Sequence, residues 1–196
     1  MVRELKSKLD EARQILGIDI RRDKLKGNLF YLKRIICRKK VVSRCRISQS
    51  KPVGNPLGQR LKLTKEQRPK TEDERKKMES IPYSNGIGSI MYDMVCTRPE
   101  LAHGVGVLSR FMTDPGQIHW EALKWMFRHI KGSLDTGLLF QNNFQGGGFI
   151  EGFVDSDFAG CMDTRKSLFG YVFTLYGTVV SWKSTLQSVV ALSFNH

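Results

Sequence analysis

Two aspartates stand two residues apart in an otherwise apolar stretch, Ile150 to Gly160 (IEGFVDSDFAG). Side chains alternate along a β-strand, so Asp155 and Asp157 would project from the same face, with Phe153 beside them. Two adjacent carboxylates repel each other unless a cation or a hydrogen-bond donor lies between them. Mg²⁺ prefers carboxylate oxygens, and a pair of such ions roughly 4 Å apart cleaves phosphodiesters. Two interpretations follow: metal ligands on a strand, or a strand that ends at Asp155 with the pair capping a turn.

The cysteines show no spacing typical of a metal site. No CxxC pair is present, so free thiols, buried or on the surface, are favoured over a zinc centre or a disulfide framework. A reducing intracellular compartment, cytoplasmic or nuclear, fits this usage. The four positions are Cys37, Cys45, Cys96 and Cys161.

The histidines and the remaining acids belong to no recognisable catalytic motif. His103, His119 and His129 lie on or beside expected helical faces, where packing or surface exposure is favoured because no motif pairs them with a nucleophile. We interpret His196 as a frayed terminal residue. An unrelated metal-dependent hydrolase would require another convergent acid. The acids left for that role have no motif placement: Glu151, Asp135 and Asp163.

The net charge of +13 is concentrated in the first part of the chain. Residues 1–80 hold 24 Lys and Arg against 10 Asp and Glu, whereas residues 81–196 hold 8 against 9. This asymmetry indicates a polyanionic partner, most simply nucleic acid, because neutralised phosphates release counterions. A solvated basic surface without a specific partner is the alternative. The side chains that we expect to contact nucleic acid are Arg34, Arg38, Lys39, Lys40, Arg44 and Arg46.

Hydropathy favours an intracellular protein without a membrane partner. No apolar run approaches the roughly 18 residues that a membrane helix needs. The charged start, MVRELKSKLDEARQ, is unlike a signal peptide. No feature points to a small-molecule substrate.

The elements expected in the first part of the chain are two helices and a hairpin. Leu5, Leu9, Ala12 and Leu16 share one helical face, with Gly17 as the stop. GIDIRR and NLFYL predict a β-hairpin, and apolar residues over 32–45 predict a second, very basic helix. SKPVGNPLGQ is a loop. Thr64 to Ser80 is interpreted as a polar linker or an exposed segment.

The next part predicts helices, and the part after it predicts strands. A helical stripe over residues 87–95 precedes a second helix, for which Thr97 can cap, Pro99 suits the first position and Glu100 can complete a capping box. A third stripe, WEALKWMFRHI, stops at Gly132. Four strands are then expected in GLLF, FIEGFVDSDF, SLFGYVFTLYG and TVVSWKST.

The sequence around the aspartates resembles a known family. FVDSDFAGCMDTRKSLFGYVFTL followed by TVVSWKSTLQSVVALS is similar to the start of the ribonuclease H region of Ty1/copia-type retrotransposon Pol polyproteins. Upstream, ILGIDIRRD, KPVGNPL, TRPELA and PGQIHWEALKWMFRHIKG resemble the segment after the polymerase active site of the same polyproteins. The order of these motifs makes the resemblance specific, and it covers nearly the whole chain.

The resemblance implies an α+β fold: partial reverse transcriptase thumb and connection helices followed by an incomplete ribonuclease H-like mixed β-sheet. The expected division is a basic end of the reverse transcriptase palm and thumb (1–63), a polar linker (64–80), a helical connection (81–136) and a truncated ribonuclease H-like region (137–196). Asp155 matches the leading metal ligand of the ribonuclease H site, and Asp157 would support it. Mg²⁺ is the implied cofactor, and an RNA–DNA hybrid or other nucleic acid is the implied partner.

Several departures from the family pattern indicate a remnant without catalytic activity. The polymerase aspartates precede the matching segment in the family, and the glutamate-bearing helix and later aspartates that follow ALS are absent from this sequence. Cys161 stands where the family usually has an acid, and Leu168–Phe169 replace small hydroxyl residues. Asp155 is therefore expected to be vestigial, with no stable Mg²⁺ site, and residues 137–196 to be of limited stability. The alternative is a non-specific nucleic-acid-binding protein that uses its basic first part.

Overall fold

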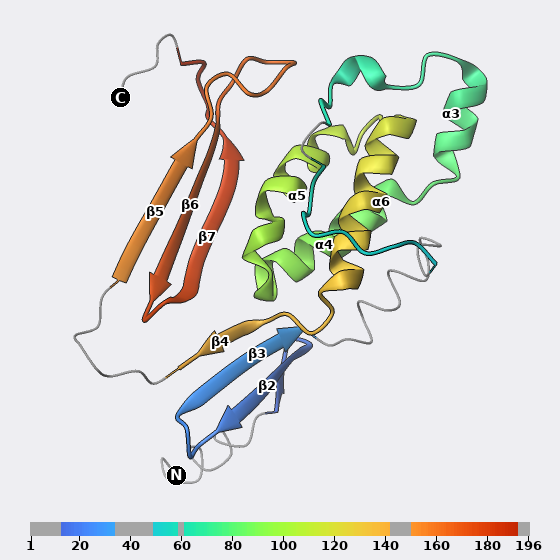
Figure 1. Cartoon of the computed structure of the whole chain (residues 1–196). Helices are drawn as coiled ribbons and strands as arrows, with labels where there is room; N and C mark the ends of the chain where they lie inside the picture. The colour runs from blue at the N-terminus through green and yellow to red at the C-terminus, as the bar shows by residue number, and fades with distance from the viewer. Residues whose placement is uncertain (1–12, 34–48, 59–60, 142–149, 192–196) are drawn as a thin grey trace, which may run out of the picture.

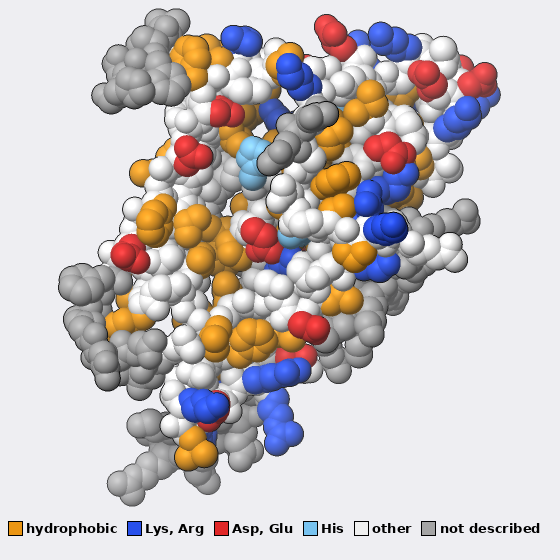
Figure 2. Space-filling model, in the orientation of Figure 1, with side chains coloured by type: hydrophobic (Ala, Val, Ile, Leu, Met, Phe, Trp, Pro, Cys, Tyr) orange, Lys and Arg blue, Asp and Glu red, His pale blue; other side chains and the backbone are white. Residues whose placement is uncertain are grey.

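The computed structural model describes residues 13–33, 49–58, 61–141 and 150–191, and their fold is α+β. A group of helices lies beside a three-stranded sheet, and a second sheet lies below both in the view of Figure 1. Figure 2 shows the same view in space-filling form, with side chains coloured by type. The six basic residues predicted to contact nucleic acid, and most of the two helices expected before residue 48, lie outside the described residues.

The predicted hairpin is confirmed and forms the centre of the first sheet. β2 (Ile18–Asp23) pairs antiparallel with β3 (Asn28–Lys33), and Asp23 accepts hydrogen bonds from the backbone N–H groups of the turn that joins them. β1 (Gln14–Ile15) adds to the other side of β2. The expected N-terminal helix therefore does not extend to Leu16. Leu16 and Gly17 both have positive φ (49° and 73°), which is the conformation of a tight hairpin turn.

A strand from far along the chain completes this sheet. β4 (Leu138–Phe140) pairs antiparallel with β3, so that Tyr31 lies opposite Leu138 and Leu29 opposite Phe140. The strand itself was predicted. Its position differs from the expected grouping with the C-terminal strands, because its apolar side chains pack beside the hairpin, where the Tyr31 and Phe140 rings meet edge to face.

The polar segment Thr64 to Ser80 is largely exposed, as expected, but it contains regular structure. A short 3-10 helix, η1 (Lys65–Gln67), precedes α3 (Glu72–Glu79). A capping box starts α3, because Thr71 Oγ1 accepts from the Glu74 N–H and the Glu74 carboxylate accepts from the Thr71 N–H. Buried Met78 attaches the helix to the protein.

Three α-helices form the main core. α4 (Tyr83–Thr97), α5 (Ala102–Leu108) and α6 (Gln117–Gly132) pack together, with the 3-10 turns η2 (Pro99–Leu101) and η3 (Ser109–Phe111) on either side of α5. The predicted stripes are confirmed except at Met91 and Val95, which are exposed on α4, and Gly132 ends α6 as expected. Their fully buried members include Ile87, Ile90, Leu101, Leu108, Leu123 and Phe127.

The start signal proposed at Thr97 is wrong. Thr97 is the last residue of α4 and is buried, and Pro99 opens only the short turn η2. Glu100 does not complete a capping box but forms an ion pair with Arg98. Arg98 is fully buried and also donates to the backbone oxygen and hydroxyl of Ser133, at 3.0 and 2.6 Å. Burying the Arg98 guanidinium without acceptors would be costly in free energy. Glu100 therefore pairs with Arg98 instead of forming the expected cap.

The second sheet contains the three C-terminal strands, all as predicted. β5 (Ile150–Ser156), β6 (Leu168–Leu175) and β7 (Thr178–Leu186) pair antiparallel in the order β5-β6-β7. The mixed sheet that was expected is not seen among the described strands, which are all antiparallel. β7 packs against α5, with Ser184 beside Gly106, and Thr178 Oγ1 donates to the Leu139 backbone oxygen at 2.6 Å. β5 and β7 are the edge strands of this sheet, and none of the described strands pairs with the free side of β5.

Candidate functional site

Asp155 and Asp157 both open onto a cleft of about 370 Å³ between the second sheet and the turn η2 with the start of α5. Phe153, also predicted for this face, lines the same cleft. The register explains the placement, because Asp155 lies opposite Gly170 of β6, which has no side chain to cover it. The helical wall contributes Glu100 and His103.

Asp157 has a structural role at the end of β5. Its backbone N–H donates to the Leu168 oxygen at 3.0 Å, and its Oδ1 accepts from the Leu168 N–H at 2.6 Å. The same carboxylate lies against Gly160, where a Cβ would overlap it. The strand continues to Ser156, one residue beyond the end proposed in the turn-cap interpretation. The cap interpretation nevertheless describes the role of Asp157 in closing the loop between β5 and β6.

On the helical wall, His103 experiences the charge of Asp157. Desolvation lowers the pKa of His103, the negative charge of Asp157 opposes that shift, and Arg110 reinforces it. The pKa of His103 therefore lies below the usual value for histidine, which disfavours the charged ring that would offset the carboxylates.

The acids of the described residues do not gather around Asp155. No group of three or more His, Cys, Asp or Glu that could hold a metal ion is found in the described part of the chain. Asp163 accepts from the Lys65 N–H, and Glu151 accepts from the Thr174 hydroxyl, so neither completes the site. Mg²⁺ requires several oxygen ligands in near-octahedral geometry. The described residues thus do not fit a complete magnesium site.

The described cysteines are free thiols, as predicted, and Cys37 and Cys45 lie outside the described residues. Cys161 is buried in the loop after Asp157, where Arg110 Nη1 contacts its sulfur at 2.9 Å. Burial raises the pKa of this thiol, but hydrogen bonds from Thr164 and the charge of Arg110 outweigh burial, and the net shift is downward. The contact between Cys161 and Arg110, which belongs to η3, attaches this loop to η3.

Two of the other histidines pack as predicted. His119 is fully buried and stacks on Phe111 with ring centroids 4.0 Å apart. Its Nδ1 accepts from the Gly116 N–H at 2.8 Å, and its Nε2 lies 3.1 Å from the Thr64 oxygen. His129 Nδ1 lies 3.3 Å from the Val53 oxygen. His103 differs, because it lines the cleft.

The described structure adds a basic surface that the sequence reasoning missed. A hollow of about 880 Å³ on β1 and β2 is lined by four cations and one acid. Arg21, Arg22 and Lys24 lie within four consecutive residues, and the strand pairing across the first tight turn brings Arg13 to the same hollow. The run RRDK at residues 21–24 was therefore a signal for this surface in the sequence. The lining includes Arg13, Asp19, Arg21, Arg22 and Lys24.

Comparison with known proteins identifies the chain. Over 185 residues, 94% of this chain, it is 44% identical to the retrovirus-related Pol polyprotein from transposon TNT 1-94 of Nicotiana tabacum. The chain belongs to the retrovirus-related Pol polyproteins of copia-type transposons. A second copia-type Pol polyprotein, from transposon RE2 of Arabidopsis thaliana, is 31% identical over 78% of the chain. The resemblance to copia-type Pol polyproteins is confirmed, and the assignment to reverse transcriptase and ribonuclease H regions stays a prediction.

The match to these Pol polyproteins covers a small part of each. The chain spans 14% of the TNT 1-94 polyprotein and 10% of the RE2 polyprotein. A shorter relative, the secreted RxLR effector protein 161 of Plasmopara viticola, is 46% identical over 59% of this chain and 80% of its own length. No family model and no solved structure match the chain. Among the described helices, none combines the length and apolarity that crossing a membrane requires.

Proposed function

We propose that this chain is the part of a copia-type Pol polyprotein that joins the reverse transcriptase to the ribonuclease H region, and that it contacts nucleic acid without cleaving it. The observation that carries the proposal is the 44% identity over 94% of the chain. The placement of Asp155 on a strand facing a cleft supports it, because a metal-binding acid needs an open strand face. Asp155 is then the vestige of the first ribonuclease H ligand.

The acids near Asp155 in the sequence are engaged in other hydrogen bonds, which is the reason to expect no cleavage. Asp157 is engaged with the Leu168 N–H, and Asp163 and Glu151 bond elsewhere. One open carboxylate does not hold two Mg²⁺ ions in the geometry that phosphodiester cleavage needs.

Contact with nucleic acid is the part of the proposal that the basic hollow supports. Its four cations, on a hairpin close to the chain start, can neutralise backbone phosphates without reading sequence. The predicted contacts at 34–46 lie outside the described residues and remain predictions. We expect non-specific affinity, with Kd about 10⁻⁴ to 10⁻⁶ M at physiological salt, and a steep loss of affinity as salt increases.

Fluorescence anisotropy with a labelled 20-base-pair RNA–DNA hybrid tests this contact. The double variant R21E/K24E should weaken binding about tenfold or more at low salt, since each reversal replaces an attraction by a repulsion. R75E/K76E is the matched control, because it changes the net charge equally on the exposed part of α3, away from the hollow. Equal losses in both variants, or binding unchanged by salt, would contradict the proposal.

A further inference from the structure

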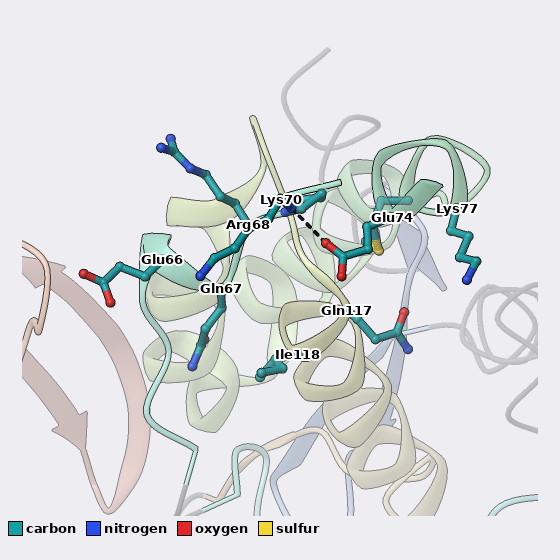
Figure 3. Close-up of a pocket in the computed structure, with 10 residues that line it drawn as sticks. Glu66, Gln67, Arg68, Lys70, Glu74, Lys77, Gln117 and Ile118 are labelled. Atoms are coloured by element: carbon teal, nitrogen blue, oxygen red, sulfur yellow. Dashed lines mark hydrogen bonds between the residues drawn. The ribbon is translucent and has the colours of Figure 1, made fainter. Parts of the chain in front are cut away.

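A second hollow, distinct from the acidic cleft and from the basic hairpin, lies between α3 and the first turn of α6 (Figure 3). Its volume is about 550 Å³, within the range of roughly 300–1,000 Å³ typical of ligand pockets. Residues 66–70 form one wall, α3 forms another through Glu74, Lys77 and Met78, and α6 contributes Gln117 and Ile118.

The apolar part of this hollow is aliphatic. Pro69 and Met78 are buried in its lining, and Ile118 remains 44% exposed at the start of α6. None of the lining residues is aromatic. An exposed isoleucine beside a buried methionine offers burial to an aliphatic side chain, and burying one such side chain is worth roughly 1.5–3 kcal/mol.

The charge that the hollow offers to a ligand is positive. Arg68, Lys70 and Lys77 line it and are exposed. Of the two acids in the lining, Glu74 is already engaged, because its Oε2 accepts from the Lys70 N–H at 2.8 Å and the Thr71 N–H at 3.3 Å. The other acid, Glu66, points away from the rest of the lining in Figure 3. Three exposed cations therefore line the hollow beside its aliphatic part.

The walls of the hollow are fixed to each other before any ligand arrives. His119 bonds the Gly116 N–H at the start of α6 and lies 3.1 Å from the Thr64 oxygen that precedes η1. Gly116 approaches the Gln67 backbone so closely that a Cβ would overlap it. The capping box of Thr71 fixes the start of α3. A preformed site loses less entropy on binding.

We propose that this hollow binds a short segment of a partner protein in which an aliphatic side chain is flanked by acidic residues. The aliphatic side chain would lie against Ile118 and Met78, and the acids would pair with Lys70 and Lys77. A nucleic acid fits less well, because single-stranded bases bind by stacking on aromatic rings. The proposal is independent of the nucleic-acid contact proposed for the hairpin.

The test is fluorescence anisotropy with a fluorescein-labelled ten-residue peptide of alternating Asp and Leu. We expect K77E and I118E each to weaken binding about tenfold, the effect of losing one favourable charged or apolar contact. K76E is the matched control, since Lys76 is the exposed neighbour of Lys77 on α3 and does not line the hollow. It should change affinity less than twofold. Equal melting temperatures for the three variants would show that the fold is retained.

Three outcomes would overturn the proposal. Equal weakening by K76E and K77E would mean that only the overall charge matters. Equal binding of a peptide with Ser in place of Leu would remove the role of the aliphatic floor. Displacement of the labelled peptide by a ten-nucleotide oligothymidylate, lost in K77E but retained in K76E, would assign the hollow to nucleic acid instead.

Discussion

Asp157 accepts a 2.6 Å hydrogen bond from the backbone N–H of Leu168 and so joins the end of β5 to the start of β6. The second carboxylate of the pair thus has a structural task, while Asp155, two residues earlier, is exposed on the cleft. The two acids share a strand face but differ in their surroundings, and the first prediction separates them.

Replacing Asp157 by Ala should lower the free energy of unfolding by about 1–2 kcal/mol, because the Leu168 N–H loses a charged acceptor. Asp155→Ala is the matched control and should change the free energy by less than about 0.5 kcal/mol, as expected for an exposed side chain. Urea unfolding followed by circular dichroism measures both. A larger loss for the Asp155 variant would contradict the assignment of roles.

The buried ring of His119 predicts that stability decreases in acid. Burial lowers the pKa of His119 below its unfolded value of 6.5, so the unfolded chain binds the proton more readily. The stabilisation is fully present above pH 6.5 and is lost as the pH falls below that value. Protonation would also remove Nδ1 as the acceptor for the Gly116 N–H.

Thermal unfolding between pH 7.5 and pH 5 checks this dependence. The variant H119Q should be less stable at pH 7.5 and should show a flatter pH profile than the parent chain. H103Q controls for the second histidine whose pKa is lowered, and should retain more of the slope than H119Q, because His103 is exposed whereas His119 is fully buried. A slope that survives in H119Q but disappears in H103Q would contradict the prediction.

Two glycines should respond to alanine in opposite directions. Gly88 lies inside α4, and a Cβ there meets nothing within 4 Å, so G88A should stabilise the protein by about 0.5–1 kcal/mol. At Gly116 a Cβ would overlap the Gln67 backbone oxygen, so G116A should destabilise it by about 1–3 kcal/mol. Chemical denaturation of both variants gives the comparison. Similar values for the two would contradict the described packing of η1 on α6.

The open edge of β5 predicts an alternating pattern of amide exchange. Asp157 donates to β6, and the pairing alternates along an antiparallel ladder, so the N–H groups of Phe153 and Asp155 also face β6. Those of Gly152 and Val154 face the open edge. Residue-resolved hydrogen exchange should be faster at the second pair than at the first. Uniform protection along β5 would mean that another strand covers this edge, for instance through self-association.

Local patterns predicted much of this fold. The hairpin and the three C-terminal strands were predicted because alternation and glycine turns lie close together in the sequence, and the helical stripes because their apolar residues repeat. The helix α3 was not predicted, because its segment is so rich in charged residues that it was interpreted as a linker, although Thr71 and Glu74 form a capping box at its start. The local sequence therefore did contain a helix start signal, but the charged composition of the segment favoured a linker instead.

The remaining differences come from contacts between distant residues. The pairing of Leu138 with Tyr31 joins segments about a hundred residues apart, and no local pattern specifies it. The role of Asp157 depends on Leu168, across a loop. Arg13 reaches the other cations of the basic hollow only when β1 pairs with β2. The candidate acids could be read from the sequence, but the partners that decide their roles could not.

The most direct test of the proposed function is a cleavage assay on a labelled RNA–DNA hybrid in Mg²⁺, with the full chain and its Asp155→Asn variant. We expect both proteins to bind the hybrid equally and neither to shorten the RNA strand. Cleavage by the full chain that disappears in the Asp155→Asn variant would contradict it, since Asp155 would then belong to a working metal site.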